Sequence, residues 1–178
     1  MTVARRCALF IACCLVSTVA WLQAFAADVN GAKNNAPKVE LNSASAQPRQ
    51  LEDTTEIAIS RDYSLAWKTL AAALNENRAD ALDAAFVGIA RQKIGSAIED
   101  QKKAGLHRRY TDRGHKLQAI FYSPEGSAME LRDTAQLEVE TLDGNTVIHR
   151  EQITQPYLVL MTVAEGSWKV RVLEELPK

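Results

Sequence analysis

The chain has 178 residues, with 21 basic and 22 acidic side chains and a formal net charge of −1. A near-neutral chain offers no broad basic face to a phosphate backbone, so we expect no nucleic acid partner. The length suits one domain with a sizeable core.

The N-terminus has the order of a secretory signal peptide, predicted over residues 1–26. Two arginines open it, an uncharged apolar run follows over Cys7–Phe25, and small residues precede a cleavage site before Ala27 or Asp28. We therefore expect an exported protein, periplasmic or secreted. Two alternatives remain. The apolar run approaches the length of a spanning helix, about 20 residues, which allows an uncleaved membrane anchor, and Cys13 loosely matches a lipoprotein site.

Cysteine usage agrees with export. All three cysteines, Cys7, Cys13 and Cys14, lie inside the predicted signal peptide. Cleavage would leave a chain without disulfides, thiol nucleophiles or cysteine-ligated metal. It would also remove two arginines, so the mature charge would be 19 − 22 = −3.

Residues 27–55 are rich in Asn, Ser, Ala, Gln and Pro and poor in apolar side chains. Such a segment buries too little apolar surface to offset its ordering entropy. The composition predicts a flexible linker, followed by a single domain over residues 56–178.

Helical periodicity predicts two helical regions in that domain. Over residues 61–75 apolar side chains recur at steps of three and four, with Ser60 as the N-cap. The pattern returns over residues 78–104, where Gly88 and Gly95 are expected to divide it. The stripes expected to face a sheet are Tyr63, Trp67, Leu70 and Leu74 in the first region, and Phe86 and Ile89 in the second.

After residue 106 the period changes from 3.6 to 2, which is typical of strands. The alternating segments cover residues 116–121, 135–140, 157–163 and 168–172. Short glycine-containing turns separate them, so we expect neighbouring strands to be antiparallel. The predicted fold class is α+β, with N-terminal helices packed on a curved four-stranded antiparallel sheet. Its other face, with Glu138, Glu140, Lys169 and Arg171, should meet solvent or a partner.

The order of elements and the closing motif Gly166-Ser167-Trp168-Lys169-Val170 resemble the nuclear transport factor 2-like superfamily, the cystatin-like α+β cone. The resemblance covers about residues 61–176 and concerns the fold. It implies a pocket between helices and sheet, which enzymes of the superfamily line with Asp, His or Tyr. This sequence has no matching Asp–His pair at recognisable positions, and the superfamily includes many non-catalytic modules.

The densest polar segment is residues 107–116. One hypothesis makes it an anion site at a pocket mouth, with Arg108, Arg109 and Arg113 as donors and His115 nearby. The simpler interpretation, which we favour, is a solvated connection between helix and strand. Because His107, His115 and His149 lack metal-ligand spacing, we expect no metal, and no motif calls for a cofactor.

Other candidates depend on a pocket being present. Acid–base candidates are Tyr110, Asp112, Tyr122, Glu130, Asp133 and Tyr157. Trp67 and Trp168 could line a ligand site, although tryptophans at these spacings are more often core residues.

Two functional hypotheses follow. The first is an exported, non-catalytic module of the cell envelope that binds a partner protein or forms a homodimer. The second is a cone that holds a small apolar ligand and performs an isomerase- or hydrolase-like acid–base step. A membrane would be involved only if the signal segment stayed uncleaved.

Overall fold

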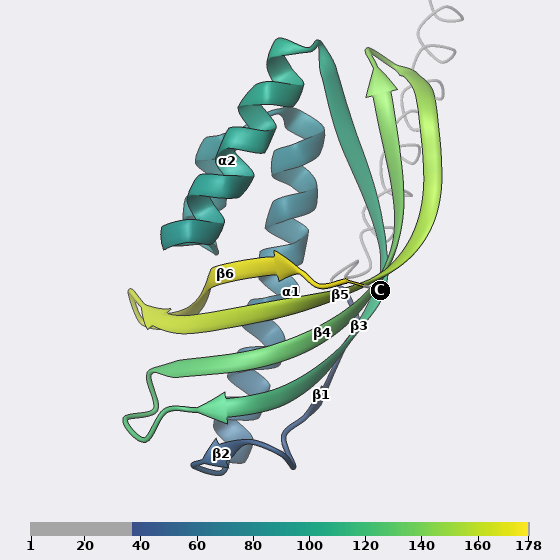
Figure 1. The fold of residues 1–178 in the computed structure, drawn as a ribbon. Coiled ribbons are helices and arrows are strands. Elements are labelled where there is room, and N and C mark those ends of the chain that lie inside the picture. The colour runs from purple at the N-terminus through teal and green to yellow at the C-terminus, as the bar shows by residue number, and fades with distance from the viewer. Residues whose placement is uncertain (1–36, 178) are drawn as a thin grey trace, which may run out of the picture. The chain divides into compact units, whose positions relative to one another are not determined.

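The computed structural model describes residues 37–177. The predicted signal peptide and the first ten residues of the predicted linker, 27–36, lie outside the described residues. The described part contains two α-helices, one 3-10 helix and a six-stranded sheet (Figure 1).

Helix α1 spans Asp53–Glu76, a 3-10 helix η1 spans Ala79–Ala84, and α2 spans Gly88–Lys103. The predicted regions were therefore right in kind but not in bounds. Helix α1 begins eight residues earlier than expected, with Glu52 rather than Ser60 at its N-cap position. The second region does divide at Gly88, whose φ of 56° suits glycine. Gly95, in contrast, lies inside α2, so the break predicted there is wrong.

The sheet is mixed rather than four-stranded and antiparallel. Four long strands form an antiparallel meander: β3 (Leu106–Tyr122), β4 (Ala128–Asp143), β5 (Thr146–Ala164) and β6 (Ser167–Glu175). Two short strands, β1 (Val39–Asn42) and β2 (Gln47–Pro48), pair in parallel with β3 at the edge. In Figure 1 the meander bends strongly, and α1 passes behind its lower half.

The prediction of a flexible linker is wrong from Val39 onward. Val39 pairs with His115, Leu41 with Leu117, and the start of α1 takes residues 53–55. The Ser64 hydroxyl also donates to the Pro37 carbonyl at 2.9 Å. Composition was misleading here because β1 is stabilised by backbone hydrogen bonds to β3, some 75 residues away in the sequence. Its own apolar side chains contribute less to that stability.

The core lies between α1, the Leu82 and Phe86 region, and one face of the sheet. Tyr63, Trp67, Leu70 and Leu74 are all buried there, which confirms the first stripe. The second stripe is half right. Phe86 is buried, with an isolated bridge to Val170, whereas Ile89 is 52% exposed because α2 turns that residue outward.

The expected solvent face also needs correction. Glu140 and Lys169 are buried among ion-pair and hydrogen-bond partners. Arg171 is exposed as expected, and Glu138 is only partly exposed. Within residues 37–177, neither α-helix combines the length and the apolar character that crossing a membrane requires.

Candidate functional site

A β-bulge in β3 brings two polar side chains onto the core face. Asp112 pairs with Leu137 and Gly114 with Gln136, so Arg113 is an extra residue between two consecutive partners. Residues three apart on a regular strand point to opposite faces. The bulge reverses that relation, and Asp112 and His115 both face the helices.

His115 is held between two carboxylates. Its Nδ1 lies 2.7 Å from Oδ2 of Asp133 on β4, and its Nε2 lies 2.7 Å from Oδ2 of Asp112. The Tyr63 hydroxyl of α1 donates to the same Asp133 oxygen at 2.8 Å. We call these four residues the interior network.

Aromatic rings cover the interior network. The His115 ring centroid lies 4.5 Å from that of Trp67 and 5.5 Å from that of Tyr63, and Trp67 also packs edge-on against Tyr157. The side chains of His115 and Asp133 are 0% exposed. The interior network is therefore enclosed by packed side chains at its centre, with only Asp112 partly reachable from outside.

The electrostatics favour a charged histidine. Burial alone lowers the pKa of His115, but hydrogen bonds to Asp112 and Asp133 and their negative charge raise it to about 9. A ring that donates from both nitrogens to carboxylates must carry both protons. Burial, followed by the charge of Asp133, raises the pKa of the Tyr63 hydroxyl well above its usual range, so this group stays a donor.

This arrangement resembles acid–base machinery but also suits a structural role. A buried imidazolium between two carboxylates is compensated electrostatically, and its removal would leave uncompensated charge. One oxygen, Oδ1 of Asp133, has no hydrogen-bond partner in the described part of the chain. The two ring nitrogens serve different carboxylates, so the groups do not converge on one point. No cluster suited to a metal occurs among residues 37–177.

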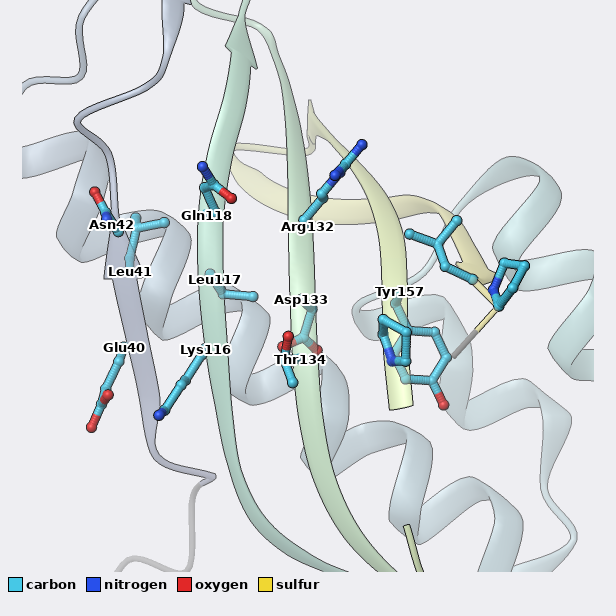
Figure 2. A pocket seen from close by; sticks show the side chains of 13 residues that line it. Glu40, Leu41, Asn42, Lys116, Leu117, Gln118, Arg132, Asp133, Thr134 and Tyr157 are labelled. Atoms are coloured by element: carbon cyan, nitrogen blue, oxygen red, sulfur yellow. The ribbon is translucent and has the colours of Figure 1, made fainter. Parts of the chain in front are cut away.

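A hollow of about 720 Å³ lies on the opposite face of the sheet (Figure 2). Two rows of paired residues form its floor, one through Asn42, Gln118 and Arg132 and the other through Glu40, Lys116 and Thr134. The floor side chains are exposed, whereas those of the row between them point into the core. We call this hollow the outer groove.

The C-terminal segment forms an end of the outer groove. Leu176 and Pro177 line it together with Pro156 of β5. The Leu176 backbone N–H donates to the Pro156 carbonyl at 2.9 Å, and the Gln155 side-chain amide donates to the Leu176 carbonyl at 2.9 Å. This wall is therefore tied to the sheet at two points.

The structure separates the residues that the sequence grouped. The segment 107–116 is not a loop but the first part of β3, and its last histidine is fully buried, so the interpretation as a solvated connection is wrong at His115. Arg109 and Arg113 lie on the outer face and pair with Glu140 and Glu138. The anion-site hypothesis thus placed its donors where two of the three already have carboxylate partners, and Arg108 is exposed at the strand's start.

Of the acid–base candidates, Asp112 and Asp133 do meet, together with His115. Tyr157 lies one ring away behind Trp67, and burial raises its pKa. Tyr110 is half-buried further along β3, and burial raises its pKa too. Tyr122 packs against Trp168 instead, and Glu130 lies on the outer face of β4. Trp67 and Trp168 are both buried, which confirms the interpretation as core residues.

Sequence reasoning missed one member of the network, Tyr63, and did not pair His115 with Asp112 and Asp133. A signal for the pair was present. Gly114 comes two residues before the alternating segment 116–121, and a glycine within a strand often marks a bulge. The Gly114 backbone N–H donates a hydrogen bond to Oδ1 of Asp112 at 2.8 Å, within the bulge.

No protein-family model and no curated protein matches the chain, but solved structures do. The intermembrane-space region of the chloroplast protein ARC6 superposes with a TM-score of 0.58 at 17% identity, covering 74% of this chain and all of that one. A scytalone dehydratase-like protein from Novosphingobium aromaticivorans superposes with a TM-score of 0.50 at 13% identity, covering 70% of this chain and 87% of that one. These likenesses concern the fold, and the chain has the nuclear transport factor 2-like α+β fold.

Proposed function

We propose that the chain is an exported, non-catalytic interaction module of the cell envelope, which binds through the outer face of its sheet. The observation that carries the proposal is the contrast between the two faces. The catalytic-looking groups lie under packed aromatic rings. The large hollow lies on the other side of the strands, where exposed polar side chains form its floor and Pro156, Leu176 and Pro177 line one end; Asp133 and Tyr157 also border it, but their side chains are buried.

The interior network accounts for the buried charges without chemistry. A general acid or base must come within hydrogen-bonding distance of its substrate. Here both ring nitrogens of His115 are already used at 2.7 Å, and Trp67 covers the ring face. Through Tyr63, His115 and Asp133, the network links α1 to β3 and β4. It therefore helps to hold the helix in place on the sheet.

A site-specific crosslinking experiment tests the proposal. A photo-crosslinking amino acid at Gln118, in the outer groove, should give a discrete adduct with one envelope protein or with a second copy in exporting cells. The same group at Lys68, on the exposed side of α1, is the matched control and should give none. Absence of any adduct at Gln118, together with a strictly monomeric protein, would contradict the proposal.

The second candidate is the acid–base cone, and one observation favours it. Tyr63 and the Nδ1 of His115 both bond to Oδ2 of Asp133, and Oδ1 of Asp133 is buried without a partner in residues 37–177. A ligand donor could satisfy that oxygen if the interior opened. Native mass spectrometry of residues 27–178 from an exported preparation decides between the two. A retained small-molecule mass supports the cone, and a clean apo mass or a defined assembly supports the interaction module.

A further inference from the structure

The outer groove carries two cations, Lys116 and Arg132, that form no ion pair among the described residues, although Glu40 lies opposite Lys116. Neither Lys116 nor Arg132 takes part in an ion pair within residues 37–177, although both are exposed. Figure 2 shows them on neighbouring strands, β3 and β4, with the Lys116 side chain extending toward Glu40 and the Arg132 side chain extending away from it. Uncompensated cations in a hollow offer a positive potential to whatever enters it.

Neighbouring arginines on the same face behave differently. Further along the meander, Arg109 and Arg150 both pair with Glu140, and Arg113 pairs with Glu138. Those charges are compensated, so they strengthen the sheet and add little to ligand attraction. In the outer groove, by contrast, Lys116 and Arg132 keep their charge without an ion pair in residues 37–177, and Glu40, which lies opposite Lys116 and pairs with Lys38, offsets part of it.

The groove also has an apolar side. Pro156, Leu176 and Pro177 line one end, and Leu158, half-buried, stands opposite Arg132 on the next strand. The hollow thus offers charged donors next to an apolar wall. An inorganic anion would contact only the charged donors, and an apolar ligand would contact only the apolar wall.

We infer that the outer groove binds a short acidic segment of a partner protein, with one carboxylate on Arg132, a second on Lys116, and an apolar side chain against Leu176 and Pro177. This inference rests on the proposed function and names its partner class. Arginine's planar fork matches a carboxylate with two parallel hydrogen bonds, and lysine adds a point charge. A membrane surface or nucleic acid fits less well, because the chain as a whole carries no positive excess.

A peptide-binding assay with paired pools tests the inference. The probes are fluorescein-labelled nine-residue peptides with three fixed Asp and one fixed Leu, and a matched pool with Asn in place of Asp. We expect the Asp pool to bind residues 27–178 at least 10-fold more tightly than the Asn pool, by fluorescence anisotropy. Raising NaCl from 50 to 300 mM should weaken the Asp pool alone.

The variants K116Q and R132Q, alone and combined, identify the site. The double variant should lose the preference for the Asp pool, whereas K68Q, an exposed cation on α1 without an ion pair in residues 37–177, should keep it. Amide shifts on adding the Asp pool should centre on β3 and β4 around Gln118 and Thr134. These exposed positions should not affect folding, and a circular dichroism melt checks that.

Equal binding of the two pools, or an unchanged preference in the double variant, overturns the inference. So does a dimer that the double variant dissociates, since the occupant would then be a second copy. The proposed function fails separately. If Gln118 still crosslinks a protein that acidic peptides do not displace, the interaction module stands and only the acidic partner is wrong.

Discussion

Raising the pH from 7 to 9.5 should destabilise the domain through His115. Its folded-state pKa of about 9 lies above the ordinary 6.5, because hydrogen bonds to Asp112 and Asp133 outweigh the cost of burial. A raised pKa contributes stability that is fully present below pH 6.5 and is lost as the pH rises through about 9. The side chain is 0% exposed, so solvent screens these interactions little.

The magnitude follows from the pKa difference. A change from 6.5 to about 9 corresponds to about 3.4 kcal/mol when complete, at roughly 1.36 kcal/mol for each pKa unit. Proton linkage leaves about 2.6 kcal/mol of this at pH 7 and about 0.2 kcal/mol at pH 9.5. We therefore expect the free energy of unfolding to fall by about 2 kcal/mol over this range.

Urea denaturation followed by tryptophan fluorescence measures the effect, because Trp67 and Trp168 are buried. The control variant is H149Q, which removes an exposed histidine and should keep the full decrease. The variant D112N should shrink it by lowering the pKa of His115. A direct readout, the imidazole resonances of His115 in the unmodified protein, does not depend on any variant folding.

A free energy of unfolding that stays constant within about 0.5 kcal/mol from pH 7 to 9.5 would refute the reasoning. So would His115 resonances that titrate near 6.5. Either result would mean that the histidine is neutral, with one carboxylate protonated in its place. The interior network would then carry a different charge from the one derived above.

Two further predictions concern packing and the turns. I59A should lower the free energy of unfolding, measured by urea denaturation, by about 2–5 kcal/mol, because Ile59 is 0% exposed. I57A, at a 67% exposed site on the same helix, should change it by no more than about 0.5 kcal/mol. Equal changes for the two variants would disprove the assigned helix face. G126A should destabilise more than G144A. Both glycines have positive φ, but a Cβ at Gly126 would lie 3.0 Å from the Tyr122 hydroxyl, while nothing lies within 4 Å at Gly144; thermal melts of the two variants check the order.

Local patterns in the sequence determined much of the fold. Alternation of side chains and short glycine turns identified the four strands of the meander, since a strand's two faces are set by its own residues. Helical spacing placed Tyr63 and Trp67 on one face of α1, and both are buried. The closing motif Gly166–Val170 indicated the superfamily fold. These features depend on residues that are close in sequence, so they can be predicted without knowing how the rest of the chain folds.

Only the tertiary structure decided the parts that matter for function. The strand Val39–Asn42 forms because β3 supplies its backbone hydrogen bonds, so the polar composition of this segment wrongly predicted a flexible linker. One extra residue, Arg113, reverses the facing of everything before it in β3 and thereby joins Asp112 to His115. The charge of the outer groove also depends on the tertiary structure. Strand register decides which basic side chains lie beside carboxylates on the next strand, as Arg113 and Arg150 do and Lys116 and Arg132 do not in residues 37–177. The sequence alone does not reveal that register.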